Sequence, residues 1–224
     1  MNNGNLALVN LSGSALKMIA LVSMTMDHVG YYAVGLQRGL GDSYIYEWMR
    51  SVGRLAFPIF CFLIVKGYLH TSSLKRYMMT MLVAAAISEI PWYLLGNRDS
   101  HNVIFTMFLG LLAIHVINRL KDNRWLVLIT MTIIGGLAWL LNTDYSWKGV
   151  CVIVVFFLFR ERKLLAIPFG FPLLMEYGVV GTVIGMMLPL GYNGCRGFIR
   201  GRYMKYLFYV YYPFHLTVIW LCLN

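Results

Sequence analysis

Charged residues are scarce in this chain, and acidic ones are the scarcest. Of its 224 residues, 9 are Asp or Glu and 19 are Lys or Arg, so that 12% are charged while 59% are hydrophobic. A soluble globular domain averages about 25% charged and about 45–50% apolar residues. The composition therefore predicts a polytopic membrane protein with an all-α fold, a bundle of transmembrane helices.

Signals of several other protein classes are absent. The four cysteines show no metal-ligand spacing, which predicts reduced thiols and no metal site. There is no Walker or dinucleotide fingerprint, no serine-nucleophile motif and no His-Glu-x-x-His. The N-terminus lacks a basic stretch ahead of its apolar segment, so we expect that segment to be retained as a span. Because no repeat and no long linker is visible, residues 1–224 are predicted to form a single membrane domain.

The net charge of +10 comes from Lys and Arg in short clusters between apolar runs. This pattern sets the topology of membrane proteins and attracts anionic lipid headgroups. We therefore expect contact with membrane lipid and no binding of nucleic acid. The same clusters are candidates to meet an anionic cofactor.

Apolar runs divide the chain into candidate spans, each of which needs about 20 residues. They predict about nine segments, with approximate bounds 15–36, 54–69, 77–95, 103–117, 125–141, 149–159, two runs within 164–190, and 206–223. Residues 37–53 are predicted to form a mixed loop.

The stretch 164–190 has two interpretations. It is either one tilted helix or two short crossings broken near Glu176-Tyr177-Gly178. Two crossings place the basic clusters at 75–76, 119–124, 160–163 and 196–205 together on the cytoplasmic side, which the positive-inside rule favours. Three arginines of the first outer loop count against this topology, namely Arg38, Arg50 and Arg54.

Several polar residues lie inside the apolar runs. Asp27 and His28 occupy the first segment, where a charge costs a few kcal/mol. Glu89 and His215 lie at a similar depth in other segments, about 15–18 Å from the cytoplasmic end at about 1.5 Å per residue, and Arg54 can reach the same layer. Such residues mark a functional site by default. The alternative is polar packing between helices.

Two histidines are candidate bases for an amine or hydroxyl acceptor. Because Asp27 and His28 point about 100° apart on a helix, we expect one to face the reaction space while the other pairs with Arg54. His28 is then the first candidate base, oriented by Asp27 or Glu89.

His215, with Tyr212, is the alternative base, unless it is a core histidine bonded to a tyrosine. We interpret His115 as a packing residue, and His70 and His101 as ordinary histidines at segment ends.

A glycine-punctuated basic loop follows residue 192. Exposed backbone amides and guanidinium groups suit phosphate oxygens, so the loop is a candidate seat for the phosphates of a nucleotide-bearing donor. The alternative is a topology anchor. Its polar residues are Asn193, Arg196, Arg200, Arg202 and Lys205.

Short motifs occur in a fixed order along the chain. They include Met26-Asp27-His28-Val29-Gly30, Gly53-Arg54-Leu55-Ala56-Phe57-Pro58, Ile87-Ser88-Glu89-Ile90-Pro91, Asn102-Val103-Ile104-Phe105-Thr106, Asp144-Tyr145, Tyr192-Asn193-Gly194-x-Arg196-Gly197 and Tyr212-Pro213-Phe214-His215. Together they resemble the TraX family of F-pilin acetylation proteins over nearly the whole chain.

The resemblance implies an integral-membrane acyltransferase of the bacterial cytoplasmic (inner) membrane, with acetyl-CoA as donor substrate. The named activity of the family is acetylation of the pilin N-terminal amine in conjugation. The acceptor of this chain, a peptide or a glycan, cannot be inherited, because the family occurs in bacteria without an F-type pilus. The chain is also distantly similar to transmembrane acyltransferases that include lysosomal heparan-glucosaminide acetyltransferase, in which an intramembrane histidine is functional. The matching motifs mark further binding candidates, namely Asn102, Thr106, Asp144 and Tyr145.

Two positions depart from the family pattern. Asp144-Tyr145 lacks the glycine expected directly after the tyrosine, and Cys195 stands where a lysine is common. The second change removes a charge from any contact with a CoA phosphate.

The leading hypothesis is therefore acetyl transfer, with the donor entering at the basic loop and Arg54 binding a carboxylate or the oxyanion. His28 either deprotonates the acceptor or carries the acetyl group transiently. One alternative is a non-enzymatic proton-coupled transporter that uses the same intramembrane groups. Another is a membrane subunit of a conjugation or secretion apparatus. Binding of acetyl-CoA discriminates between these classes.

Overall fold

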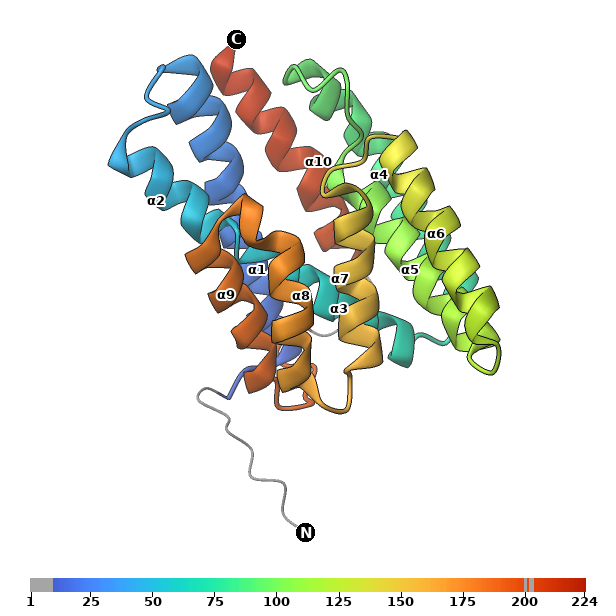
Figure 1. Cartoon of the computed structure of the whole chain (residues 1–224). Helices are drawn as coiled ribbons and strands as arrows, with labels where there is room; N and C mark the ends of the chain where they lie inside the picture. The colour runs from blue at the N-terminus through green and yellow to red at the C-terminus, as the bar shows by residue number, and fades with distance from the viewer. Residues whose placement is uncertain (1–9, 200, 202–203) are drawn as a thin grey trace. The chain divides into compact units, whose positions relative to one another are not determined.

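The computed structural model of the protein describes residues 10–199, 201 and 204–224. This part of the chain is helical, and its only strand-like pairings are two isolated bridges, Leu11 with Tyr192 and His101 with Thr143. The predicted all-α fold is therefore confirmed. The α-helices are α1 Gly13–His28, α2 Tyr44–Gly53, α3 Ala56–His70, α4 Leu74–Leu94, α5 Val103–Leu120, α6 Arg124–Leu140, α7 Ser146–Leu158, α8 Ala166–Leu174, α9 Val179–Met187 and α10 Met204–Leu223 (Figure 1).

Four helices of the described chain are long and apolar enough to cross a membrane. They are Tyr44–His70, Leu74–Leu94, Val103–Leu120 and Tyr206–Leu223. Three apolar helices are shorter, Arg124–Leu140, Ser146–Leu158 and Val179–Gly191. These lengths and the composition make the chain a membrane protein.

The chain folds into two compact units, each built from separated stretches. Unit 1 comprises Met1–Leu63 and Phe159–Met204, and unit 2 comprises Ile64–Leu158 and Lys205–Asn224. The units are therefore interleaved along the sequence and are not successive domains.

Unit 1 is organised around α1. Ser12 caps this helix by accepting a hydrogen bond from the Ala15 N–H at 3.2 Å. After His28 the helix continues as a π-helix, Val29–Gln37. Such π-helical segments are rare, and they occur frequently at functional sites.

The prediction of a loop over residues 37–53 is wrong, because α2 occupies Tyr44–Gly53. Ser43 caps α2 by accepting a hydrogen bond from the Tyr46 N–H at 3.2 Å. Charged residues made this segment look like a loop, but in the helix Glu47 is exposed and Arg50 pairs with Asp27 of α1. The helix is amphipathic, and its polar and charged side chains follow a period of about 3.6 residues.

Glycines let α2 and its neighbours approach closely. A Cβ atom added to Gly53 would lie 2.4 Å from the Asp27 Cβ, and one on Gly30 would lie 2.9 Å from the Met49 Cβ. On α9, a Cβ on Gly181 would lie 1.9 Å from the Ser51 carbonyl oxygen. Small residues therefore bring α1 and α9 against the same short helix α2.

The helix break expected within 164–190 is present. Helix α8 ends at Leu174, a 3₁₀ turn covers Met175–Tyr177, and Gly178 has φ 138°, a conformation that favours glycine. Helices α8 and α9 pack against each other (Figure 1). Each of them has nine residues and is about 14 Å long, which is shorter than a full crossing, so the topology of this stretch stays a prediction.

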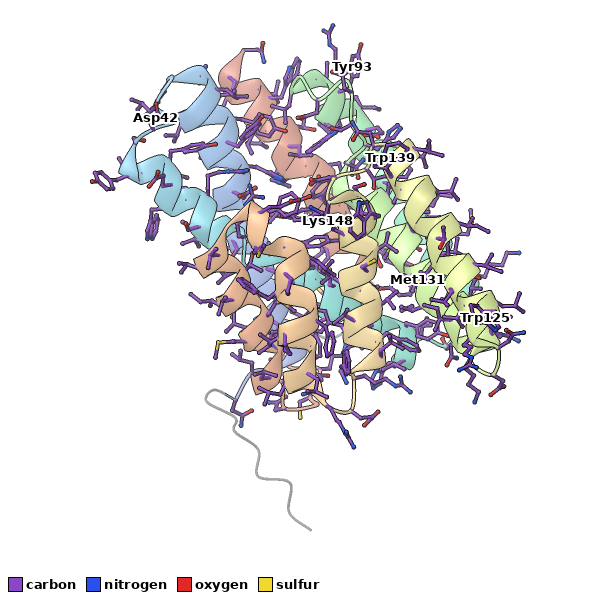
Figure 2. All side chains as sticks on the ribbon, in the orientation of Figure 1. Asp42, Tyr93, Trp125, Met131, Trp139 and Lys148 are labelled. Atoms are coloured by element: carbon purple, nitrogen blue, oxygen red, sulfur yellow. The ribbon has the colours of Figure 1, made fainter. Side chains whose placement is uncertain are left out.

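Unit 2 is built on α5, which packs against α4, α6 and α7. At the closest approach, a Cβ on Gly110 of α5 would lie 2.2 Å from the Ile153 Cδ1 of α7. Helix α6 is mostly exposed and carries Trp125 near one end and Trp139 near the other, 68% and 66% exposed (Figure 2). Exposed tryptophans at helix ends are typical of membrane–water interfaces.

The two ends of unit 2 differ in charge. The turn from α5 to α6 holds Arg119, Lys121 and Arg124. The turns from α4 to α5 and from α6 to α7 lie together at the other end, because the His101 N–H donates to the Asn142 carbonyl oxygen at 3.1 Å. The Asp144 N–H returns a bond to the His101 carbonyl oxygen at 2.9 Å.

Candidate functional site

Unit 1 places a carboxylate between two guanidinium groups. Arg50 Nη1 donates to Asp27 Oδ2 at 2.7 Å, and Arg54 Nε lies 3.9 Å from Asp27 Oδ1. The three side chains are only 13–22% exposed. Asp27 lies 14 residues after the start of α1, about 21 Å along the helix axis. A mostly buried charged cluster is thus held between α1 and α2.

Packing fixes this cluster in place. Arg50 and Arg54 lie one helical turn apart. Gly53 lies between them in sequence, and a Cβ atom added to it would meet Asp27. The Arg50 guanidinium lies 5.0 Å from the ring centre of Tyr31, and that of Arg54 lies 5.9 Å from the ring centre of Tyr177. Such cation–π contacts stabilise a guanidinium where water is scarce.

The expected pairing of Asp27 with Arg54 is present, but Arg50 makes the shorter contact. The sequence analysis did not select Arg50 as a site residue, because it lies in the stretch that was predicted to be a loop. Its spacing of four residues from Arg54 was the available signal, since residues four apart share one helix face. His28 is half-buried on α1, with its ring 6.2 Å from that of Tyr32.

The basic loop of unit 1 is tied to the start of α1. The Gly13 and Ser14 N–H groups donate to the carbonyl oxygens of Cys195 and Arg196, each at 2.9 Å. Ser14 Oγ also donates to the Arg196 carbonyl oxygen at 2.7 Å, and it accepts from the Ile199 N–H at 2.8 Å. These bonds give the loop a defined shape at the start of α1.

Asn193 and Gly197 set the path of this loop. Asn193 Nδ2 donates to Asn10 Oδ1 at 2.6 Å, and Asn193 Oδ1 accepts from the Cys195 N–H at 2.8 Å. Gly197 has φ 88°, and a Cβ there would lie 2.4 Å from Ser12 Oγ. A residue with a side chain at this position would displace the loop from α1.

Positive side chains gather around the loop. Lys163 Nζ donates to the Tyr192 carbonyl oxygen at 3.3 Å and lies 5.4 Å from the Tyr192 ring centre. Burial raises the pKa of Tyr192, so its phenol stays neutral beside this lysine. Lys17 of α1 lies close enough to Arg196 for the two charges to repel. The other two predicted arginines, Arg200 and Arg202, lie outside the described residues.

Unit 2 holds a second polar cluster, centred on Glu89. His101 Nδ1 and Glu89 Oε1 form a short hydrogen bond, and Asn102 Nδ2 donates to Glu89 Oε2 at 3.1 Å. Asn102 is fully buried, and it also donates to the Ala85 carbonyl oxygen at 2.9 Å and caps α5 through the Ile104 N–H. From the sequence, we interpreted His101 as an ordinary histidine at a segment end. The signal that could have identified it is its position directly before Asn102, a predicted binding residue.

Three more predicted binding residues, Thr106, Asp144 and Tyr145, lie beside this cluster. Thr106 Oγ1 donates a short hydrogen bond to the Asp144 carbonyl oxygen. The backbone then enters the left-handed region at Tyr145 and Ser146, with φ 61° and φ 46°. Residues other than glycine rarely adopt this conformation, and those that do often cluster at functional sites.

His215 has a different environment in unit 2. Its Nδ1 donates to the Tyr211 carbonyl oxygen at 2.9 Å, its ring stacks on Tyr211, and it meets the edge of Tyr212. His215 and Tyr212 are 5% and 4% exposed. A buried ring bonded to its own helix is what the packing alternative predicts, and a catalytic role for this pair stays a prediction.

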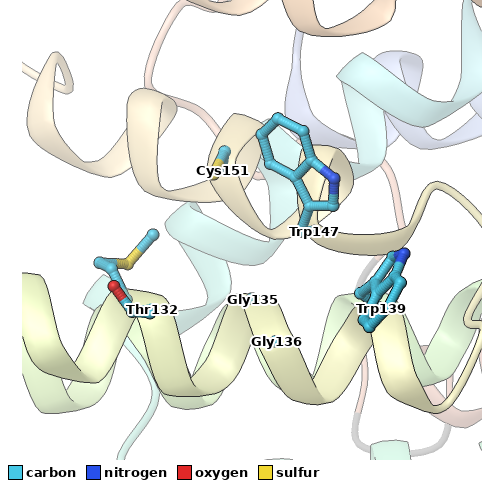
Figure 3. Close-up of a pocket in the computed structure, with 7 residues that line it drawn as sticks. Thr132, Gly135, Gly136, Trp139, Trp147 and Cys151 are labelled. Atoms are coloured by element: carbon cyan, nitrogen blue, oxygen red, sulfur yellow. The ribbon is translucent and has the colours of Figure 1, made fainter.

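A shallow cleft lies between α6 and α7 (Figure 3). Trp147 and Cys151 of α7 face Gly135, Gly136 and Trp139 of α6 across it. It contains none of the predicted site residues. Among the described residues, no group of three His, Cys, Asp or Glu side chains is placed to hold a metal ion.

The predicted polar layer thus divides between the two units. Unit 1 brings Asp27 together with Arg54, and His28 follows Asp27 on the same helix. Unit 2 holds Glu89 and His215, each with its own neighbours. Guanidiniums near a carboxylate can bind an anionic group, and a carboxylate-bound imidazole can accept a proton.

Comparison with known families matches residues 12–223 to the TraX protein family model. The chain belongs to the TraX family. The resemblance of the sequence motifs is thereby confirmed, and the match includes every predicted site residue from Asp27 to His215.

Two curated proteins are similar to this TraX family member. A probable fimbrial assembly protein FimC, serogroup H1, of Dichelobacter nodosus is 26% identical over 243 residues, covering 94% of this chain and 95% of that protein. An uncharacterized protein of Rickettsia prowazekii (strain Madrid E) is 26% identical over 153 residues, covering 66% of this chain and 56% of that protein. No solved structure matches.

Proposed function

We propose that this TraX family protein is a membrane-embedded acetyltransferase that moves acetyl from acetyl-CoA to an amine or hydroxyl of an envelope acceptor. The observation that carries the proposal is the basic loop held against the start of α1. The loop contributes Arg196, Lys163 lies beside it at Tyr192, and Lys17 lies near Arg196 in spite of their repulsion. Like charges gathered at one end of a unit favour an anionic ligand.

CoA is an anionic ligand of the required kind, because it carries a pyrophosphate and a ribose phosphate. Gly194 and Gly197 have φ 82° and 88°, so the loop turns tightly and exposes backbone to a close ligand. Arg196 is exposed, whereas its carbonyl oxygen is used by Ser14. The guanidinium is therefore available to phosphate while the backbone beneath it is fixed.

The arginines of the Asp27 cluster are assigned to the reacting groups. A guanidinium in a site of low water content binds a carboxylate or stabilises an oxyanion strongly. Arg54 and Arg50 are held by Asp27, which preorganises them at little further cost in entropy. His28 and His215 stay predicted bases.

The relative in Dichelobacter nodosus is named as a probable fimbrial assembly protein. The N-terminal amine of a pilus or fimbrial subunit is accordingly our first candidate acceptor, and an envelope glycan is the second. Such an acceptor fits a location in the inner membrane of a bacterium.

A comparison of cells with and without the gene tests the proposal. Mass spectrometry of envelope peptides and glycans should find acetylated products that depend on the gene. The variant Arg196→Ala should reduce their amount, whereas Lys121→Ala, a cation of unit 2, should leave it unchanged. Identical acetylation with and without the gene would contradict acetyl transfer and favour the transporter.

A further inference from the structure

The cleft between α6 and α7 opens on an exposed apolar side of unit 2 (Figure 3). It has a volume of about 510 Å³, within the range of about 300–1,000 Å³ that is usual for small-molecule sites. Beside it on α6, Ile133 and Leu137 are 57% and 41% exposed. In a membrane protein such an apolar face contacts lipid, so the molecules that reach the cleft are those of the bilayer.

The cleft lies at a defined depth in the membrane. Trp125 and Trp139 lie near the two ends of α6, 14 residues and about 21 Å apart, as residues of the two aromatic belts do. Trp139 and Trp147, the second residue of α7, line one end of the cleft. From there the cleft extends to Met131, eight residues and about 12 Å along α6. This length is most of one leaflet of a hydrocarbon core about 30 Å thick, and it follows the direction of an acyl chain.

Two glycines form the floor of the cleft without being needed for helix packing. A Cβ atom added to Gly136 would have no atom within 4 Å, and one on Gly135 would lie 3.5 Å from the Trp147 Cβ, an ordinary contact. Glycine in a helix interior lowers helix stability relative to alanine. The space that Gly136 leaves open is therefore available to a molecule outside the chain.

A cation is held at the end of the cleft that carries the tryptophans. Lys148 Nζ lies 5.9 Å from the ring centre of Trp147, which lines the cleft. Deeper along α6, the Thr132 hydroxyl donates to the Leu128 carbonyl oxygen at 3.1 Å, so its proton is already used. The cleft thus combines an ammonium group at the level of the lipid headgroups with an apolar interior.

We propose that the α6–α7 cleft binds one phospholipid, with its phosphate on Lys148 and an acyl chain over Gly136 between Trp139 and Trp147. This end of unit 2 lies opposite the basic α5–α6 turn, which the positive-inside rule places in the cytoplasm, so the lipid belongs to the outer leaflet. It covers a helix that buries few side chains of its own. The site lies within unit 2 and is independent of the proposed acetyl transfer.

Native mass spectrometry of the purified full chain in detergent tests the phosphate contact. Phosphatidylglycerol with two oleoyl chains is titrated in, and diacylglycerol with the same chains is the matched probe without phosphate. We expect the wild type to retain one phosphatidylglycerol with an affinity about tenfold or more above that for diacylglycerol. Lys148→Gln should lower the affinity for phosphatidylglycerol to that for diacylglycerol. Lys121→Gln, which removes an exposed cation at the other end of unit 2, should bind like the wild type.

A second pair of variants tests the seat of the acyl chain. Gly136→Phe fills the cleft where no atom of the chain lies near the added Cβ, and it should abolish retention of both probes. Ile133→Phe adds a ring to an exposed position of α6 outside the cleft and should bind like the wild type. Thermal unfolding without lipid should give equal midpoints for wild type and Gly136→Phe, which separates loss of the site from loss of the fold.

Three results would overturn the inference. They are equal affinity of the wild type for the two probes, retention that Lys148→Gln or Gly136→Phe leaves unchanged, and a lower unfolding midpoint of lipid-free Gly136→Phe. A lipid-free dimer that Gly136→Phe converts to a monomer would assign the cleft to a second copy of the chain and overturn it as well. Each of these outcomes leaves the proposed function standing, because neither probe nor variant concerns the basic loop.

Discussion

Arg50 and Asp27 lie 23 residues apart in sequence and form an ion pair within unit 1, with Nη1 and Oδ2 2.7 Å apart. Arg50 belongs to a helix and Asp27 to the end of another, so the pair joins α2 to α1. The contact leaves Arg54 at 3.9 Å as a second cation near the same carboxylate. The pair therefore supports both the packing of unit 1 and the orientation of its candidate site.

Loss of Arg50 should weaken unit 1. Arg50→Ala leaves Asp27 with one distant cation in a site that is 15% exposed, and we expect a loss of about 1.5–3 kcal/mol. Thermal unfolding of the purified protein in detergent measures this. Arg38→Ala removes an exposed arginine of the neighbouring turn and should leave the unfolding midpoint unchanged. Equal midpoints for the two variants would show that the ion pair contributes nothing.

Gly53 should not tolerate a side chain. In Gly53→Ala the new Cβ would lie 2.4 Å from both Cβ and Oδ1 of Asp27, so α2 must move and the contact with Arg50 must open. We expect a loss of about 1–3 kcal/mol from overpacking. Gly136→Ala is the control, since no atom lies within 4 Å of its added Cβ. If both variants unfold at the wild-type temperature, the close approach of α1 and α2 is contradicted.

Loss of Asn102 should lower the stability of the protein more than loss of an ordinary helix cap. Asn102→Ala removes the cap of α5 together with buried bonds to Ala85 and Glu89, with an expected loss of about 2–3 kcal/mol. Asn123→Ala removes only the exposed cap of α6 and should cost about 1 kcal/mol. Denaturant or thermal titration of the two variants side by side measures the difference. Equal losses would mean that Asn102 does not hold Glu89.

Replacing Ser146 by glycine should stabilise the protein. Ser146 has φ 46°, a conformation that favours glycine, and its buried Oγ has no hydrogen-bond partner among the described residues. Ser146→Gly should therefore add about 0.5–1 kcal/mol. Ser51→Gly, on an exposed site of α2, should instead cost about 0.5 kcal/mol. A lower midpoint for Ser146→Gly would argue against the left-handed turn.

Helical content was readable from the sequence because apolar runs of span length leave few alternatives. The end of segment one, expected near Leu36, falls at Gln37. Helix α2 was not predicted, since Glu47 and Arg50 made it look like a polar loop and the partner of Arg50 lies on α1, 23 residues away in sequence. The same limit applies to the site: the sequence could select Asp27 and Glu89 by their depth, but not the partners that folding brings to them, Arg50 and His101.

The structure explains why a glycine is expected directly after Tyr145. The family pattern expects glycine there, and the structure places Ser146 in the backbone region that glycine adopts most readily. The lysine commonly found at position 195 is replaced by an exposed cysteine. In the proposed function, anion binding is therefore assigned to Arg196 of the loop and Lys163 beside it.

Binding of acetyl-CoA to the purified full-length protein tests the central claim most directly. Equilibrium dialysis in detergent with [14C]acetyl-CoA should show saturable binding that weakens as salt is raised, because charge pairing with phosphate is screened. The double variant Lys163→Ala/Arg196→Ala should bind about tenfold or more weakly, and Lys121→Ala should bind like the wild type. Saturable, salt-sensitive binding lost only in the double variant is the predicted result. Absence of saturable binding by the wild type would contradict the account.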